Sequence, residues 1–589
     1  MTGSRIEDIL PLSPLQQGMW FLSLYDEDGP DVYTVVSAFD IEGDLDVRVL
    51  RAAAETVLRR NANLRVAFRQ RKTGEPVQIV LRDLPLPWTE HDLTTLPPQQ
   101  RDAELARIME RAAAHRFRLQ DPPLLSFRLV RLAERRHRFI MVNHHILLDG
   151  WSMPLLAAEL FRCYAAGGDD RSAPATPYRA YLEWIGRQDP STAEKAWLGA
   201  LEDLDGGTLV VPGRQDRPAR PPRRLAHTLG AAETARLTGL ARDRGLTLGT
   251  LVQGAWAGVL SGITGRRDVV FGTTVSGRPA EIPGVEQMIG LFINTLPTRV
   301  RLDPAEPVAE LLARTQSEQA ALLDHQYLGL TDIQRAAGHG DLFDTLTVVE
   351  NYPGPAVTTV AGLRITAVPG RDATHYPLTL VAVPGDELQL WLDYRDDLVA
   401  DALAEQIAER AVRFLTELPH APRTPFARFD LLGPAQRTRL LEAGRGRTGE
   451  RPVTLPGLLA RQVAARPDAV AVSAPDGDLT YAELDERTRR RAAFFADRGV
   501  GPETVVALVL PRSVELVECA LAVMRAGGAY LPVDPDYPAE RIAFMLADAR
   551  PALAVTGTDR LAAVRAAAGT VPVLDAAEAV APAGVGAPE

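Results

Sequence analysis

One segment, residues 139–152 with the sequence FIMVNHHILLDGWS, constrains the fold of this chain more than any other. Its apolar start has the length and composition of a buried strand, and this strand runs into His144 and His145. A loop with Asp149 and Gly150 follows, and Ser152 is placed to cap the next helix. The pattern predicts two histidines where a strand ends and a helix begins, a common location for catalytic groups.

The histidine pair admits more than one role. A helix N-terminus near an imidazole disfavours the protonated ring, and a neutral imidazole can accept a proton or a hydrogen bond. The structural alternative is a pair that satisfies hydrogen bonds at the strand end. We expect no metal, because adjacent histidines on a strand point to opposite faces and no nearby Glu or Cys completes a ligand set. The chain also has no Gly-x-Ser-x-Gly turn of a serine hydrolase.

Composition narrows the class of protein. A length of 589 residues suggests about four compact units, and 46% hydrophobic with 24% charged residues is ordinary for globular chains. The formal net charge of −11 argues against nucleic-acid binding, and the Pro-rich basic run 214–224 is interpreted as an exposed loop. Two cysteines far apart, Cys163 and Cys519, exclude a disulfide scaffold and predict a cytoplasmic protein. No run of 18 apolar residues occurs, so we expect no membrane span.

Periodicity predicts an α/β chain with two lobes, at 1–172 and 173–425, a linker at 426–455 and a further unit at 456–589. Asp401 is placed to cap the last helix of the second lobe. The predicted strands cover 32–41, 76–81, 125–132, 137–142, 268–275, 296–300, 344–350, 388–394, 469–473 and 504–510. The predicted helices cover 46–60, 99–117, 194–201, 231–244, 247–260, 401–418, 456–466, 481–498 and 514–526, with one more after the loop that begins at Asp149.

The run from His144 to Gly150 resembles the HHxxxDG signature of the condensation domains of non-ribosomal peptide synthetases, which share the chloramphenicol acetyltransferase fold. Further segments resemble the other motifs of that family in the correct order. At the second motif, Asn61 and Ala62 stand where the family usually has His-Glu. These segments are LSPLQQGM at 12–19, RNANLRVAF at 60–68, YRAYLEW at 178–184, IGLFINTLPTR at 289–299, HQYLG at 325–329 and FDTLTVVENYP at 343–353.

The resemblance implies two acetyltransferase-like lobes in a V-shaped pseudodimer. An upstream donor and a downstream acceptor peptidyl carrier protein would each bring a phosphopantetheine arm to His145, and no cofactor would be bound directly. His145 would orient the acceptor amine and accept or relay its proton. His144 would face the fold, while Asp149 would pair with Arg65 to hold the loop. Ser276, Arg278 and Asn294 are candidates for the substrate tunnel.

Within the family, the segments LSPLQQGM, HQYLGL and ENYP resemble the subtype that joins a donor ending in a D-residue to an L-aminoacyl acceptor. Three alternatives stay open: an epimerisation-like domain, a non-catalytic domain that recruits partner enzymes, and acyl transfer to a small acceptor. The first lacks its Glu-Gly-His-Gly-Arg segment here, and the second usually lacks an intact HHxxxDG.

Residues 456–550 resemble the start of an adenylation domain. LTYAEL at 479–484 and MRAGGAYLPVD at 524–534 match its first two core motifs. The Ser/Thr/Gly-rich loop that would cradle phosphate with backbone amides does not follow. We therefore expect the chain to be a piece of a longer synthetase module and to activate no amino acid by itself.

Overall fold

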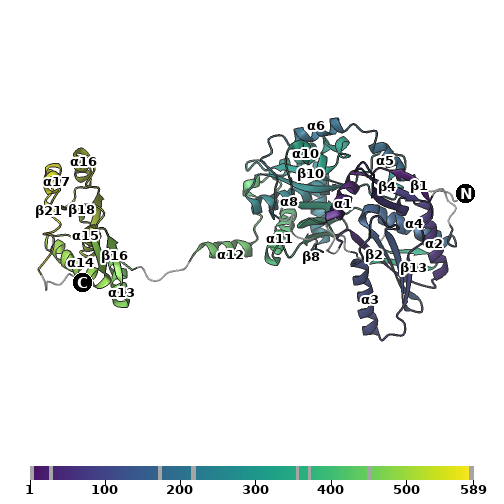
Figure 1. The fold of residues 1–589 in the computed structure, drawn as a ribbon, viewed down its shortest axis with the longest axis horizontal. Helices are drawn as coiled ribbons and strands as arrows, with labels where there is room; N and C mark the ends of the chain where they lie inside the picture. The colour runs from purple at the N-terminus through teal and green to yellow at the C-terminus, as the bar shows by residue number, and fades with distance from the viewer. Residues whose placement is uncertain are drawn as a thin grey trace. The chain divides into compact units, whose positions relative to one another are not determined.

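The computed structural model describes residues 5–25, 31–169, 176–213, 220–352, 357–368, 370, 373–446 and 453–582. Most of the predicted basic loop, residues 214–219, lies outside these ranges, as does Pro353. The chain divides into two compact units, Met1–Leu441 and Glu442–Glu589, each described here by itself (Figure 1). Within the first unit we call residues up to 169 the N-lobe and residues from 176 to 441 the C-lobe, except for residues 357–368, which join the N-lobe sheet.

The N-lobe is built on a mixed six-stranded sheet. Its strand β7 is buried along most of its length and pairs antiparallel with β2, so that His144 lies opposite Thr34. The strands in order are β12 (Val357–Val360), β13 (Leu363–Val368), β2 (Thr34–Glu42), β7 (Arg136–His144), β6 (Leu125–Ala133) and β5 (Trp88–Asp92). A smaller sheet holds β1 (Ile6–Leu10), β4 (Pro76–Leu81) and β3 (Val66–Gln70).

The N-lobe helices follow their apolar spacing. In α2, the residues Leu50, Ala54 and Val57 recur on one face and are buried, and the Asp46 side chain caps the helix by accepting from the backbone N–H of residues 48 and 49. This helix confirms the prediction over 46–60. The helices of this lobe are α1 (Pro14–Tyr25), α2 (Val47–Arg60), α3 (Pro98–Ala113) and α4 (Ser152–Ala165).

The C-lobe has a second six-stranded sheet, and its helix α8 is apolar on nearly every face and buried. Thr247 caps α8, accepting from the Thr250 N–H. The strands in order are β10 (Asn294–Arg301), β9 (Asp268–Val275), β11 (Thr345–Val349), β14 (Leu378–Val383), β15 (Leu388–Tyr394) and β8 (Arg223–Leu229). The helices are α5 (Arg179–Ile185), α6 (Pro190–Ala200), α7 (Ala231–Arg244), α8 (Leu248–Thr264), α9 (Val308–Ala320), α10 (Leu330–Ala337), α11 (Asp401–Glu417) and α12 (Pro434–Gly444).

Two strands cross from one lobe to the other. After β11 leaves the C-lobe sheet, β12 and β13 form a hairpin, and β13 pairs antiparallel with β2 of the N-lobe (Figure 1). Leu363 and Ile365 of β13 are buried in the N-lobe core. The chain then returns to the C-lobe as β14. We call residues 350–377, between β11 and β14, the crossover; sequence periodicity did not predict its strands.

The second unit is a smaller α/β fold, as the alternation of elements predicted. Its main sheet is parallel, in the order β19-β18-β20-β21, with β16 and β17 as a separate hairpin. Thr480 and Glu483 form a capping box at the start of α14. The elements are α13 (Leu455–Ala465), β16 (Val470–Ala474), β17 (Gly477–Thr480), α14 (Tyr481–Asp497), β18 (Val505–Val509), α15 (Val514–Arg525), β19 (Ala529–Val533), α16 (Ala539–Ala549), β20 (Leu553–Thr556), α17 (Leu561–Ala567) and β21 (Val573–Asp575).

Several local expectations need correction. Asp401 does not cap α11, because it accepts instead from the Arg223 guanidinium and the Tyr394 hydroxyl. The stretch predicted as a linker contains α12, and Gln436 of this helix bonds Glu409 of α11 at 2.5 Å. Among the described residues, no single helix is long and apolar enough to span a membrane. Only α7 and α8 taken together reach that length and apolar composition, and the two helices are bent by 106° relative to each other.

Candidate active site

The two histidines lie on a buried loop between β7 and α4. We call residues 144–150 the histidine loop. It is held from both sides: the His145 N–H donates to the Tyr33 carbonyl of the N-lobe at 2.8 Å, and the Asp149 N–H donates to the Gly290 carbonyl of the C-lobe at 3.1 Å. His145 begins a short 3-10 turn that ends at Leu147. The loop therefore sits at the junction of the two lobes.

His144 is enclosed by the fold. Its Nδ1 accepts the Ile146 N–H at 3.0 Å, so the ring hydrogen is on Nε2, which lies 3.4 Å from an Asp31 carboxylate oxygen. Burial lowers the pKa of His144 to about 3, with a smaller contribution from neighbouring positive charge, and burial raises the pKa of Asp31. The ring is neutral at physiological pH and both of its nitrogens face protein groups, which leaves it no proton to exchange with a substrate.

His145 differs from His144 in exposure. It retains 7% of its surface, against 1% for His144. Its backbone N–H is fixed to Tyr33, and its carbonyl accepts the N–H of Leu148. Both residues are buried, and His145 is the more exposed of the two.

Asp149 holds the loop to the C-lobe, but through a different arginine from the one expected. Its carboxylate is fully buried; it accepts the Ser152 N–H at 2.8 Å and the Phe292 N–H at 2.9 Å, and lies 3.3 Å from the Arg278 Nη2. The predicted Asp149–Arg65 pair is therefore wrong. Arg65 lies in a separate N-lobe cluster, where its guanidinium donates to Glu7 at 2.8 Å and to backbone carbonyls, including those of Leu58, Leu81 and Arg82.

Arg278 belongs to the scaffold of the histidine loop. Its guanidinium donates to the Ser152 hydroxyl at 2.9 Å and the Met288 carbonyl at 2.9 Å, and lies 4.0 Å from the Phe292 ring centroid. Burial lowers its pKa, while Asp149 acts to raise it. These contacts engage both terminal nitrogens of the guanidinium, so Arg278 lies beside Asp149 as a structural cation.

Ser152 joins the lobes instead of capping α4. Its hydroxyl donates to the Gly290 carbonyl at 2.7 Å and accepts the Gly290 N–H at 3.1 Å, so the side chain of Asp149 takes over the first turn of the helix. Gly290 is required by close packing, because a Cβ there would lie 2.3 Å from the Tyr178 ring. The Gly150 position is also tight: a Cβ would lie 2.2 Å from the Tyr352 hydroxyl.

The other tunnel candidates occupy different surroundings. Asn294 is buried at the start of β10, and its amide donates to the carbonyls of Gln326 and Leu328 at 2.9 and 2.8 Å, which fixes the 325–329 segment. Ser276 is exposed, directly after β9. The following Gly277 has φ +57, and a Cβ there would lie 1.9 Å from the Phe292 carbonyl oxygen.

Sequence reasoning missed four residues near the histidine loop. Asp31 and Tyr33 precede β2, and only the pairing of β2 with β7 brings them to the histidines. Tyr352 and His375 come from the two ends of the crossover, and His375 Nδ1 lies 2.7 Å from the Tyr33 hydroxyl. Tyr352 lies in the motif at 343–353, but nothing in the sequence indicated that any of the four would meet the histidine loop, since the contacts join segments more than 100 residues apart.

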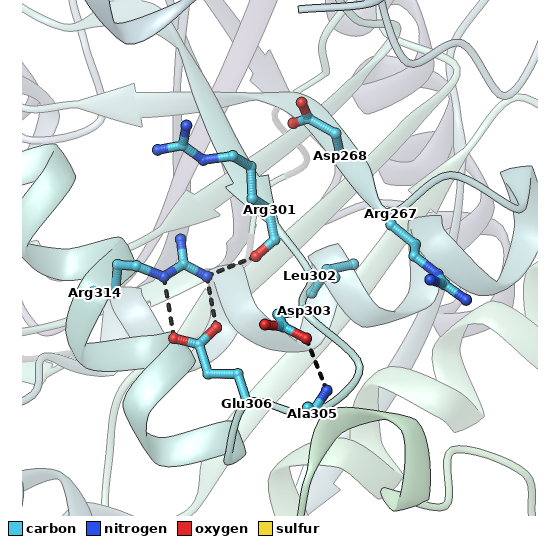
Figure 2. A pocket seen from close by; sticks show the side chains of 8 residues that line it. All are labelled: Arg267, Asp268, Arg301, Leu302, Asp303, Ala305, Glu306 and Arg314. Carbon is cyan, nitrogen blue, oxygen red and sulfur yellow. Dashed lines mark hydrogen bonds and ion pairs between the residues drawn. The ribbon is translucent and has the colours of Figure 1, made fainter.

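A surface hollow elsewhere has no link with this site. A space of about 710 Å³ lies where β9 begins and β10 ends (Figure 2). Arg314 donates to both oxygens of Glu306, at 3.1 and 2.7 Å, and also to the Arg301 carbonyl. The acidic and basic side chains that line this hollow largely neutralise each other's charge. Throughout the described ranges, no group of three His, Cys, Asp or Glu residues is arranged to hold a metal ion.

Comparisons with known proteins identify the family of this chain. Residues 6–441 match the family model described as the condensation domain, and residues 459–586 match that of AMP-binding enzymes. A linear gramicidin synthase protein of Brevibacillus parabrevis is 37% identical over 94% of this chain and 7% of its own length. Surfactin synthase subunit 3 of Bacillus subtilis is 33% identical over 94% of this chain and 44% of its own length. The chain thus spans less than half of these relatives.

Solved structures show the same fold. A four-domain non-ribosomal peptide synthetase bound to AMP and glycine aligns with a TM-score of 0.75 and 21% identity, over 98% of this chain and 45% of its own. The first condensation domain of the calcium-dependent antibiotic synthetase, in complex with a substrate analogue, aligns with a TM-score of 0.62 and 23% identity, over 72% of this chain and all of its own. With the family model covering residues 6–441, this chain belongs to the condensation-domain family, and its second unit matches the AMP-binding enzymes.

Proposed function

We propose that this chain forms an amide bond at His145 in non-ribosomal peptide synthesis. The donor is an aminoacyl or peptidyl thioester on an upstream carrier protein, and the acceptor is an aminoacyl amine on a downstream carrier protein. Each reaches the site on a phosphopantetheine arm. The observation that carries the proposal is the complete histidine loop, held at a junction of two lobes, with the His144 ring facing protein groups at both nitrogens and His145 the more exposed of the two residues.

The acceptor amine needs little activation by the enzyme to act as a nucleophile. An α-amino group has a pKa of about 7.7–8.0, so a useful fraction is unprotonated near neutral pH. Attack on the thioester carbon forms the C–N bond and a tetrahedral intermediate, the amine loses a proton, and the carrier thiolate leaves. His145 orients the amine and accepts or relays that proton. Alignment supplies the remainder of the acceleration, since well-oriented groups reach very high effective molarities.

The two lobes support this geometry. Each contains a six-stranded sheet with helices, consistent with two acetyltransferase-like halves in a pseudodimer. The histidine loop comes from the N-lobe, while Arg278, Gly290 and Phe292 come from the C-lobe. Carrier arms that enter between the lobes from opposite faces would meet at His145.

The test is a two-carrier assay with the full 589-residue chain. Both carriers are loaded with aminoacyl-pantetheine, and the amide product is identified by mass. We expect His145→Ala to reduce product formation at least about 100-fold, as loss of general base catalysis does, with carrier binding unchanged. His420→Ala, an exposed histidine, serves as the control. Product at the wild-type rate from His145→Ala would contradict the assignment, and carrier binding without product from the wild type would favour a partner-recruiting domain.

We further propose that the donor ends in a D-configured residue, on the basis of the LSPLQQGM, HQYLGL and ENYP segments. The experiment offers D- and L-terminated donor thioesters with the same acceptor and compares amide yield. A higher yield from the L-donor would contradict the subtype.

Amino-acid-dependent ATP–pyrophosphate exchange by these 589 residues is expected to be at background, because the second unit has no Ser/Thr/Gly-rich phosphate loop after Pro538.

A further inference from the structure

The His145 end of the histidine loop depends on a contact that reaches the other lobe. The Tyr33 carbonyl receives the His145 N–H at 2.8 Å. The phenol of the same tyrosine lies 2.7 Å from Nδ1 of His375, which directly precedes the buried C-lobe residue Tyr376 and, shortly after it, β14. Tyr33 therefore contacts the catalytic histidine through its backbone and the C-lobe through its side chain.

The surroundings of the Tyr33–His375 hydrogen bond keep both side chains in place. Burial raises the pKa of Tyr33, so its hydroxyl stays protonated and hydrogen-bonds Nδ1 of His375. Tyr33 is 8% exposed, and its ring lies 6.0 Å from the His144 ring, which restricts its movement. The His375 ring packs against Tyr376, with centroids 4.1 Å apart.

The contact completes a two-point attachment of the histidine loop. Asp149 ties the far end of the loop to Arg278 and Phe292 of the C-lobe. Without a second attachment, the His145 end of the loop would be fixed only to the N-lobe. The Tyr33–His375 bond supplies it, at the residue whose carbonyl fixes the His145 backbone.

We infer that Tyr33 and His375 are positioning residues that hold His145 in register with the C-lobe part of the condensation site. This inference rests on the proposed function. Neither side chain exchanges a proton with substrate in this role. A shift of about 1 Å at a catalytic group can cost on the order of 100-fold in rate. Loss of one hydrogen bond that only steers the loop should therefore reduce kcat while leaving the KM for both carriers unchanged.

The test uses the full chain with both loaded carriers. Tyr33→Phe and His375→Ala should each lower kcat about 10-fold, within the range that small displacements produce, and the double variant should fall no further than either single variant. His375→Asn should recover most of the rate, because its amide can replace Nδ1 as donor or acceptor. Tyr164→Phe is the matched control: its hydroxyl accepts the Asp46 N–H at 3.1 Å within the N-lobe.

A second measurement does not depend on catalysis. Hydrogen–deuterium exchange of the peptide covering the histidine loop should be faster in Tyr33→Phe and His375→Ala than in Tyr164→Phe, because the Tyr33 carbonyl that accepts the His145 N–H is no longer anchored to the C-lobe. Unchanged exchange, or faster exchange with an unchanged kcat, would overturn the inference. An inactive wild-type chain would overturn the proposed function instead, and the exchange comparison would still decide whether the pair holds the loop.

Discussion

At the scale of single residues, Asp149 shows how a motif acid can have the expected role and an unexpected partner. Its three donors are two backbone N–H groups and the Arg278 guanidinium. One comes from nearby Ser152, and the others from Arg278 and Phe292, which lie 129 and 143 positions away. The sequence contains many arginines, and the long flexible side chain allows several of them to be assigned to one carboxylate. Only the packing of the loop after β9 against α4 selects Arg278 over Arg65.

The partner of Asp149 can be tested by double-mutant cycles. Arg278→Met should destabilise the first unit by about 3–5 kcal/mol, because it leaves a buried carboxylate without its cation. Combined with Asp149→Asn, it should show a coupling of at least about 1 kcal/mol. The matched cycle with Arg65→Met should be additive within about 0.5 kcal/mol. Denaturant unfolding monitored by tryptophan fluorescence gives these values, and coupling to Arg65 instead would contradict the structure.

His144 predicts a pH dependence. Its folded-state pKa of about 3 lies below the ordinary value of 6.5 in the unfolded chain, so between these values the unfolded state binds more protons. Its contribution to stability is complete above pH 6.5 and is lost on acidification, at up to about 1.4 kcal/mol per pH unit. His144→Asn, which cannot titrate, should show a shallower loss between about pH 7.5 and 5.5. Asp31, whose raised pKa acts in the opposite direction, is present in both proteins; equal slopes would contradict the prediction.

At the scale of elements, periodicity located most long helices and central strands because their buried faces repeat in the sequence. It missed the crossover, where β12 and β13 are only four and six residues long. Their stability as strands comes from an edge of the N-lobe sheet that the sequence places about 320 residues earlier. The cap at Asp401 failed for a related reason, since Arg223 and Tyr394 compete for its oxygens.

The crossover can be tested through β13. Ile365, 2% exposed in the N-lobe core, should cost about 2–5 kcal/mol of unfolding free energy when changed to alanine, through lost burial and the cavity left behind. Its neighbour Arg364 points to the surface, where it pairs with Glu42 at 3.2 Å. Arg364→Ala should cost less than about 1 kcal/mol. Similar effects of the two substitutions would show that β13 is not packed on the N-lobe.

At the scale of the whole molecule, the two units have separate cores. Phe414 is fully buried in the first unit and Phe495 in the second, and no hydrophobic cluster of the described residues includes both. Chains with separate cores do not unfold in a single two-state step. The lobes of the first unit, by contrast, are joined by β13, which pairs with β2 of the N-lobe, and share the contacts of the histidine loop.

Calorimetry should therefore resolve two thermal transitions. Phe495→Ala should lower the midpoint temperature of only the transition of residues 442–589, because it reduces the unfolding free energy of that unit by about 3–5 kcal/mol. Phe414→Ala should lower only the other transition, through a similar loss of unfolding free energy. A single transition shifted equally by both substitutions would contradict the independence of the two units.

The sequence by itself determined the α/β class, the strand–histidine–helix junction and the family, because these depend on local periodicity and on the contiguous residues from His144 to Gly150. The resemblance of this run to the family motif is also the basis for proposing His145 as the catalytic histidine. Tertiary structure alone decided that Asp149 pairs with Arg278, that Ser152 bridges the lobes and that Tyr33 and His375 meet beside the histidine loop. The physical reason is that each of these contacts forms between groups that the packing of distant segments brings close together. Neither local periodicity nor sequence separation indicates which segments will meet.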